Sequence, residues 1–288
     1  MATIIDTINR AAAQLSAGGV PNARLDTELL VCHVLGRDRA WLLAHIRDGL
    51  DDERRRTFEQ LIERRAGREP LQYITGRQEF WGLDFHVTPD VLIPRPETEL
   101  IVEKALELAQ GREKPLSFID LCTGSGCIAV CLAKELPSAR IFATDTSGKA
   151  LVVARENARR HGLADRIRFF EGDLFAPLDE LDVHGQVDLI VSNPPYVPSG
   201  DRPSLQPEVR DYEPAMALFA GPDGTTVHRR IIGKAHEFLK RRGVLIMEMG
   251  LGQVEALTRM IEETGAYGTP AILKDLAGIE RVIVLKKI

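Results

Sequence analysis

Residues 118–129 read Phe-Ile-Asp-Leu-Cys-Thr-Gly-Ser-Gly-Cys-Ile-Ala, and this stretch decides the fold. Its apolar start predicts a buried strand, and its last three residues predict the start of a helix. Gly124 and Gly126 allow a tight turn between the two and let a ligand approach the backbone at the helix N-terminus. The stretch therefore predicts an α/β sheet with a ligand-binding loop after a buried strand.

The chain from residue 116 onward alternates between strand and helix patterns. Such alternation predicts a mainly parallel sheet that is covered by helices on both faces. Ligands of such sheets bind at the carboxyl ends of the strands, so residues that follow strands are the first site candidates. Strands are predicted at 116–121, 140–145, 166–170, 187–193, 243–249, 269–274 and 280–286, and helices at 127–136, 148–161, 225–241 and 252–264.

Acidic residues stand at the ends of three predicted strands. Asp120 comes immediately before the glycine loop, Asp145 ends the second strand, and Asp173 follows the third. A carboxylate in the place of Asp145 can accept both hydroxyls of a ribose, and Asp173 can accept from an adenine amino group. These residues indicate a cofactor that contains adenosine.

Two adenosine cofactors compete for this loop. The spacing of Gly124, Gly126 and Ala129 also fits the looser fingerprint of dinucleotide binding, so NAD stays open. Asp120 favours S-adenosylmethionine, because a carboxylate attracts the ammonium group of an amino acid and repels a pyrophosphate. A turn acid that caps the next helix is the structural alternative for Asp120.

Residues 193–196, Asn-Pro-Pro-Tyr, directly follow the apolar strand 187–192. The prolines end the strand and bias the residues before them toward extended backbone. The Asn193 side-chain oxygen and the Pro194 carbonyl can accept the two N–H bonds of a planar NH2 group, and Tyr196 can stack on its plane. The tetrapeptide thus indicates a methyltransferase that acts on an NH2 group, and a plain proline turn is the alternative.

Composition limits the class of protein. The chain has 288 residues, 44% of them hydrophobic, and a net charge of −5, which argues against a long electrostatic footprint on nucleic acid. No pair of cysteines has C-x-x-C spacing, so we expect buried thiols in a reducing compartment and no metal site. The N-terminal residues fit an amphipathic helix, neither signal peptide nor membrane span. We therefore expect a cytoplasmic protein with no membrane partner.

Three regions follow one another along the chain. Residues 1–74 predict a small all-helical domain, and residues 75–96 predict a hairpin and a proline-rich linker, after which residues 97–288 form the sheet domain. The helical segment has apolar faces of its own and carries no chemical motif. We expect it to recognise a protein partner, and coverage of apolar sheet surface is the alternative.

Six stretches of the chain closely resemble one family, the release-factor glutamine N5-methyltransferases. They are 73–76, 79–82, 92–99, 120–126, 192–196 and 275–278, and the proline-rich stretch 92–99 is more family-specific than the glycine loop or the tetrapeptide. The helical N-terminal segment fits the family by length and position. Two positions depart from it: Cys122 stands where the family usually has Gly, and Leu174 where some members carry an aromatic residue that packs on adenine.

The resemblance implies a Rossmann-like class I methyltransferase fold, with S-adenosylmethionine as methyl donor and S-adenosylhomocysteine as product. It implies that the substrate is the glutamine of the Gly-Gly-Gln motif in peptide chain release factors, so that methylation modulates translation termination. Asn193, Pro194 and Tyr196 would carry the reaction and, with Pro195, hold the substrate. Arg95 and Glu97 of the linker would close over the site, and fixing the first helix of the sheet domain is the alternative for both. The implied cofactor contacts are Asp120, Cys122, Thr123, Gly124, Ser125, Gly126, Asp145, Asp173, Leu174 and Asn193.

Two other functions stay open. A nucleic-acid amino-methyltransferase that acts on adenine N6, cytosine N4 or guanine N2 would use the same turn on a flipped base. An NAD-dependent oxidoreductase or a non-catalytic dinucleotide-binding module would use only the glycine pattern. We expect a monomer without direct nucleic-acid contact, and no general base, because holding the NH2 group in line for attack is sufficient.

Overall fold

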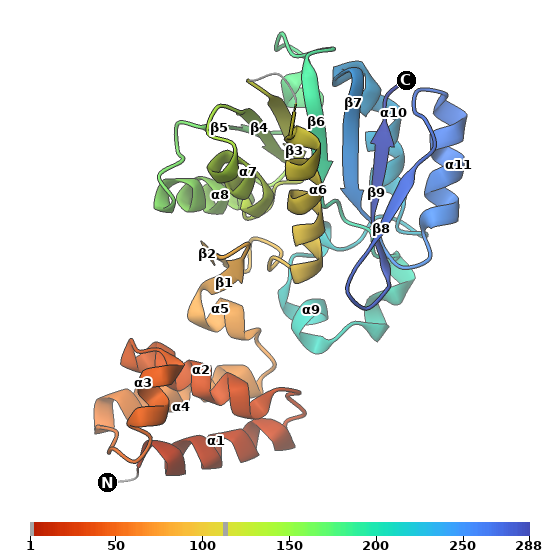
Figure 1. Cartoon of the computed structure of the whole chain (residues 1–288). Helices are drawn as coiled ribbons and strands as arrows, with labels where there is room; N and C mark the ends of the chain where they lie inside the picture. Colours follow the sequence, from red (N-terminus) through yellow and green to blue (C-terminus); the bar gives the residue numbers. More distant parts are fainter. Residues whose placement is uncertain (1–2, 112–114) are drawn as a thin grey trace. The chain divides into compact units, whose positions relative to one another are not determined.

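The computed structural model describes residues 3–111 and 115–288, and the chain divides into two compact units. The first unit comprises the chain up to Arg77 together with Gln206–Tyr212. The second comprises Gln78–Leu205 and Glu213–Ile288. Figure 1 shows the elements of both units in sequence colours.

The first unit is all-helical, as the sequence predicts. Side chains of Thr3, Asp38 and Asp51 cap the first, third and fourth helices. Apolar residues at helical spacing, among them Ile8 and Phe58, form its core. Its helices are α1 (Ile4–Ala17), α2 (Ala23–Leu35), α3 (Arg39–Ala44), α4 (Asp52–Ala66), α5 (Leu71–Thr75) and, from much later in the sequence, α9 (Pro207–Tyr212).

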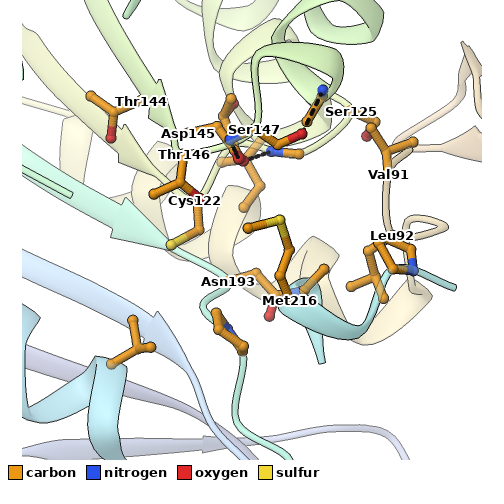
Figure 2. A pocket seen from close by; sticks show the side chains of 18 of the residues that line it. Val91, Leu92, Cys122, Ser125, Thr144, Asp145, Thr146, Ser147, Asn193 and Met216 are labelled. Atoms are coloured by element: carbon orange, nitrogen blue, oxygen red, sulfur yellow. Dashed lines mark hydrogen bonds between the residues drawn. The ribbon is translucent and has the colours of Figure 1, made fainter. Parts of the chain in front are cut away.

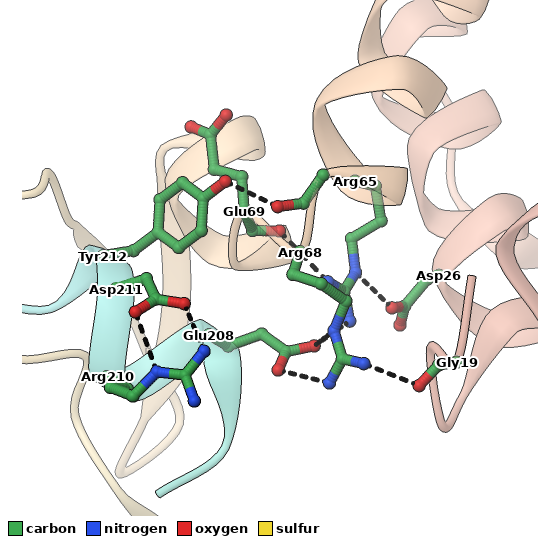
Figure 3. Close-up of polar contacts among 10 residues, drawn as sticks. Gly19, Asp26, Arg65, Arg68, Glu69, Glu208, Arg210, Asp211 and Tyr212 are labelled. Carbon is green, nitrogen blue, oxygen red and sulfur yellow. Dashed lines mark hydrogen bonds and ion pairs between the residues drawn. The ribbon is translucent and has the colours of Figure 1, made fainter. Parts of the chain in front are cut away.

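Polar contacts hold α9 in the helical unit (Figure 3). Arg65 donates to Glu208 at 2.9 Å and also to Asp26 at 2.7 Å. Arg68 donates to both Glu208 oxygens, at 2.8 and 2.6 Å, and the Tyr212 hydroxyl donates to the Gly67 carbonyl at 2.6 Å. Charge-assisted bonds of this kind to a mostly buried carboxylate attach the segment firmly.

The second unit is built on a seven-stranded sheet in the order β5-β4-β3-β6-β7-β9-β8. The strands from β3 to β7 pair in parallel, whereas β9 is antiparallel to both β7 and β8. This arrangement confirms the mainly parallel sheet that the sequence predicts. The strands are β3 (Ser117–Leu121), β4 (Arg140–Asp145), β5 (Ile167–Glu171), β6 (Val187–Ser192), β7 (Leu239–Glu248), β8 (Ala271–Lys274) and β9 (Glu280–Lys286), and β1 (Arg77–Phe80) and β2 (Leu83–His86) form a separate hairpin.

Helices cover both faces of this sheet, with one apolar core on each side (Figure 1). One core includes side chains of α6 (Glu99–Ala109), α7 (Cys127–Glu135) and α8 (Gly148–Arg160). The other includes side chains of α10 (Thr226–Phe238) and α11 (Val254–Thr264). Short 3-10 helices lie at η1 (Pro96–Thr98), η2 (Ala176–Leu178), η3 (Ser199–Ser204) and η4 (Ala215–Ala217).

The order in which strands are added to the sheet changes direction beside β3. From β3 the chain adds β4 and β5 on one side, and β6 with β7 on the other. Connections diverge at such a point and leave a crevice beyond the carboxyl ends of the strands. The glycine loop after β3 and the tetrapeptide after β6 therefore meet at the same place.

The predicted helix 225–241 is wrong at its end. The helix stops at Phe238, and β7 begins at Leu239 rather than at residue 243. Leu239 is buried and pairs with Val187, but Arg241 and Arg242 interrupt the apolar pattern by which a strand is detected in sequence. None of the described helices is long and apolar enough to cross a membrane.

Candidate functional site

A pocket in the second unit lies at the carboxyl ends of β3, β4 and β6 (Figure 2). Residues far apart in the sequence line it, including most of those that the sequence nominated. Among them are Cys122, Thr123, Gly124 and Ser125 after β3, Asp145 of β4, Gly172, Asp173 and Leu174 after β5, Asn193 and Pro195 after β6, Leu92 and Pro94 of the linker, Thr98 of η1, and Pro214, Met216 and Arg230.

The loop after β3 has the tight backbone that its glycines predict. Gly126 has φ +79°, and a Cβ there would lie 3.0 Å from the Cβ of Ala154 in α8. Gly126 therefore serves close packing and does not line the pocket, unlike Gly124. Cys122 also has a left-handed φ of +58°, a backbone conformation that glycine adopts without strain.

Asp145 joins the end of β4 to the glycine loop. Its carboxylate accepts from the backbone N–H of Gly124 and from that of Ser147, each at 2.9 Å. Burial raises the pKa of Asp145, while the two backbone bonds act in the opposite direction. Each carboxylate oxygen can accept a further bond, so hydroxyl groups in the pocket can still be bound.

Asp120 lies beneath the loop rather than on the pocket surface. Its Oδ2 atom accepts from the Thr123 hydroxyl at 2.6 Å, whereas its buried Oδ1 atom has no hydrogen-bond partner. Burial raises the pKa of Asp120 to about 7. A buried acceptor with no partner, just beneath the pocket wall, fits a cationic ligand group that it reaches through a water.

Asp173 and Leu174 form the edge of the pocket after β5. The exposed Asp173 carboxylate forms an ion pair with Arg230 of α10, a residue that no sequence motif indicates. Leu174 places a buried side chain on the pocket although its φ is +48°. No local motif marks Arg230 or Met216, because both reach the pocket only through the fold of the segment after β6.

The tetrapeptide after β6 is divided between pocket and core. Asn193 and Pro195 line the pocket, while Pro194 is buried and Tyr196 does not line it. The Asn193 Nδ2 group donates to Thr98 Oγ1 at 3.0 Å. The Tyr196 hydroxyl donates to Glu248 at 3.1 Å, and burial next to this acid raises the pKa of Tyr196.

The linker residues Arg95 and Glu97 do not line the pocket. Arg95 is paired with the buried Glu213, which also accepts from the Ile93 N–H at 3.4 Å. Burial raises the pKa of Glu213, and Arg95 acts against that shift. The ion pair between Arg95 and Glu213 therefore holds the start of the segment that leads into η4. Met216 of η4 lines the pocket. In the described part of the chain, no three His, Cys, Asp or Glu side chains form a group that could hold a metal ion.

The sheet order, the glycine loop at the switch point and the acid at the end of β4 define a class I methyltransferase. A family model described as "Methyltransferase small domain" matches residues 98–205. A solved structure of a methyltransferase from Pyrococcus furiosus superposes with a TM-score of 0.52 at 17% identity, over 72% of this chain and 90% of that one. At this identity the likeness concerns the fold alone.

Relatives at higher identity show the family. The chain is 46% identical to a release factor glutamine methyltransferase of Geobacter sulfurreducens, over 98% of this chain and 95% of the relative. It is 43% identical to one of Moorella thermoacetica, over 97% of this chain and 96% of the relative. Residues 6–76 match a model described as "PrmC N-terminal domain". The chain belongs to the release factor glutamine methyltransferases, which confirms the resemblance seen in the sequence.

Proposed function

We propose that this protein transfers a methyl group from S-adenosylmethionine to the side-chain nitrogen, N5, of the glutamine in the Gly-Gly-Gln motif of peptide chain release factors. The reaction modulates translation termination and takes place in the cytoplasm, with the enzyme acting as a monomer. The observation that carries this proposal is the position of Asn193. Its side chain lines the same pocket as the glycine loop and Asp145.

The pocket residues fit S-adenosylmethionine. Asp145 has acceptor capacity for the ribose hydroxyls, and Leu174 offers an apolar surface to the adenine. The unpartnered Oδ1 atom of Asp120 suits the ammonium group better than it suits a pyrophosphate. The bound cofactor supplies an electrophilic methyl group, and the chain's own residues orient the nucleophile.

An amide nitrogen is a weak nucleophile because its lone pair is delocalised into the carbonyl. The Asn193 Oδ1 atom and the Pro194 carbonyl accept the two N–H bonds of the glutamine amide. Holding both bonds favours a pyramidal nitrogen and stabilises the positive charge that develops on it. Such positioning supplies much of the rate enhancement, and proton loss to solvent can follow the transfer.

The main competitor is methylation of a base amino group, which could use the same tetrapeptide. The net charge of −5 and the family membership favour a protein acceptor. The test offers purified release factor, duplex DNA and ribosomal RNA separately with labelled S-adenosylmethionine. We expect label in the release factor only. Label in either nucleic acid alone would support the competing function.

We assign recognition of the release factor to the helical unit, since a specific interface buries on the order of 1,200 Å2, more than one glutamine loop provides. The test is a truncation that begins at Gln78. It also carries Glu208→Gln, so that the partner carboxylate of Arg65 and Arg68 is not left charged. We expect most activity on intact factor to be lost, and activity on a short Gly-Gly-Gln peptide to remain. Equal activity on both substrates would refute the assignment, and an insoluble product would support a covering role.

A further inference from the structure

Glu248 is a buried acid one step away from the residue that faces the substrate. It ends β7, is 1% exposed, and neither lines the pocket nor follows a sequence motif. Its carboxylate accepts from Thr98 Oγ1 at 2.6 Å and from the Tyr196 hydroxyl at 3.1 Å. Because Thr98 in turn accepts from Asn193 Nδ2 at 3.0 Å, the side chains form one continuous chain of hydrogen bonds.

The direction of each bond in this chain follows from the number of hydrogens. A threonine hydroxyl has one hydrogen, and an ionised carboxylate can only accept. Burial raises the pKa of Glu248, whereas the bonds donated by Thr98 and Tyr196 lower it and favour the ionised form. The Thr98 hydrogen goes to Glu248, so Thr98 can only accept from Asn193. The NH2 group of Asn193 must then face Thr98, which turns its Oδ1 atom the other way.

The opposite orientation of the Asn193 amide is costly. Its Oδ1 atom would face the Thr98 oxygen, or Thr98 would turn its hydrogen toward Asn193 and leave a buried Glu248 oxygen without a donor. A buried acceptor that loses its donor destabilises the folded state, and more so if the acceptor is charged. The carboxylate therefore selects one of two orientations that have almost the same shape.

We propose that Glu248 is a positioning residue that acts through Thr98 to turn the Asn193 carbonyl oxygen toward the acceptor substrate, so that the site selects NH2 groups. The proposal rests on the methyl-transfer function proposed above. It explains why an acid without access to the pocket lies directly behind it. It also explains how the two polar residues of the tetrapeptide, Asn193 and Tyr196, come to depend on one carboxylate.

The surroundings keep this acid in place. Strand β7 lies inside the sheet, and Met247 pairs with Ser192, so Glu248 lies level with Asn193, the first residue after the neighbouring strand β6. The Glu248 carbonyl contacts His228 Nε2 at 2.8 Å. Gln253 donates to the Tyr196 carbonyl at 2.9 Å. A positioning group on such rigid elements orients its target more closely than one on a loop.

Glu248→Gln is the most informative substitution because it keeps the shape. A glutamine can satisfy every group only by donating its NH2 to Thr98 and accepting from Tyr196. Thr98 then donates to Asn193, and the Asn193 amide turns over. We expect kcat to fall by about tenfold or more, the equivalent of one lost hydrogen bond of roughly 1.4 kcal/mol, with KM and cofactor affinity changed less than about twofold.

A double-mutant cycle tests the route through Thr98. Thr98→Val should lower kcat to a similar extent, and Thr98→Ser should restore most of it. In an Asn193→Ala background, neither Thr98→Val nor Glu248→Gln should lower kcat further by more than about twofold, because the side chain they orient is absent. Equal losses in both backgrounds would mean that Glu248 and Thr98 act only on the fold, and would overturn the proposal.

A spectroscopic measurement tests the orientation without any reaction. The chain has four asparagines, so the side-chain NH2 signals of protein labelled with 15N-asparagine are few, and Asn193→Ala identifies its own. We expect a nuclear Overhauser contact from the Asn193 NH2 protons to the Thr98 methyl group, weakened in Glu248→Gln. Asp188→Asn is the matched control, because Asp188 is a buried β6 acid paired with Lys240 away from the pocket. An unchanged contact in Glu248→Gln would refute the proposal even if the methyl acceptor were not a release factor.

Discussion

Arg65 of α4 donates a 2.9 Å hydrogen bond to Glu208, a residue 143 positions later in the chain. Through this bond and those of Arg68, residues 206–212 belong to the helical unit although the sheet unit precedes and follows them. The segment leaves the sheet unit after η3 and returns at Glu213, which is held by Arg95. The chain therefore crosses between the two units shortly after the tetrapeptide.

The first prediction concerns this attachment. Glu208→Gln removes the charge that partners Arg65, whose side chain is 6% exposed, and Arg68. We expect the free energy of opening of the helical unit to fall by about 3 kcal/mol, the lower end of the cost of breaking a buried ion pair. Amide hydrogen exchange in α2 and α4 measures this quantity.

The matched control for Glu208 is Asp52→Asn in the same unit. Asp52 pairs with Arg55 on the surface, with a side chain that is 73% exposed. Exposed pairs contribute about 0–1 kcal/mol, so exchange should hardly change. Equal effects of the two substitutions would mean that the Glu208 contacts do not hold the unit together.

The second prediction concerns ribose binding by Asp145. Each charge-assisted bond to a ribose hydroxyl contributes about 1.5–3 kcal/mol, so Asp145→Ala should weaken S-adenosylmethionine binding at least tenfold. Calorimetry on folded protein measures the dissociation constant. Asp173→Asn should have a smaller effect, because that exposed carboxylate is already paired with Arg230. An unchanged dissociation constant in Asp145→Ala would show that the ribose is held elsewhere.

The third prediction is a pH dependence that comes from Asp120. Burial raises its pKa from 3.8 to about 7, so between these pH values the folded state keeps a proton that the unfolded state has lost. The contribution of Asp120 to the free energy of unfolding is therefore full below pH 3.8 and is lost as pH rises through 7. Denaturant titrations at several pH values should show this slope, and Asp120→Asn should make it smaller. Asp145, Glu213 and Glu248 contribute a slope of the same sign, because burial raises their pKa values too.

The same ionisation should appear in cofactor binding. An ammonium group favours ionised Asp120, so affinity for S-adenosylmethionine should fall as pH drops below about 7, by up to about tenfold per pH unit. Asp120→Asn should bind weakly without this dependence. A wild-type affinity that stays constant from pH 8 to pH 6 would contradict the role of Asp120 in holding the ammonium group.

The fourth prediction concerns the backbone of Cys122, whose φ is +58°. A side chain in the left-handed region costs about 1–2 kcal/mol, a cost that glycine does not carry. Cys122→Gly should therefore be more stable than Cys122→Ala by about 1 kcal/mol, and neither variant has the thiol. The two denaturant midpoints give the comparison, and equal stability would mean that the loop is not strained at this residue.

The sequence predicts the strands of the sheet and the loop after β3 well, because both are marked locally. Buried strands such as β3 and β6 are continuous apolar runs, and the glycines mark the turn between β3 and α7. The start of β7 was missed because Arg241 and Arg242 lie inside it. The pattern of apolar residues and glycines predicts a strand or a turn wherever that element has a sequence pattern of its own.

Contacts between distant segments could not be predicted. Thr98 and Glu248 are separated by 150 residues, and neither belongs to a motif that specifies the other. Glu208 and its arginines are similarly distant. Arg95 and Glu97 do not line the pocket, and Arg95 is paired with Glu213, so contact of these two residues with the substrate stays a prediction. Such partners are determined by tertiary packing, on which periodicity and spacing carry no information.

The central claim is that the methyl group reaches the side-chain nitrogen of one glutamine. The most direct measurement is fragment mass spectrometry of release factor that has been incubated with enzyme and isotopically labelled S-adenosylmethionine. We predict one labelled methyl group, on the glutamine of the Gly-Gly-Gln motif, and roughly a hundredfold less label in a reaction that contains Asn193→Ala at the same concentration and time. A labelled methyl group on any other residue, or an unlabelled release factor beside a labelled nucleic acid, would contradict the account.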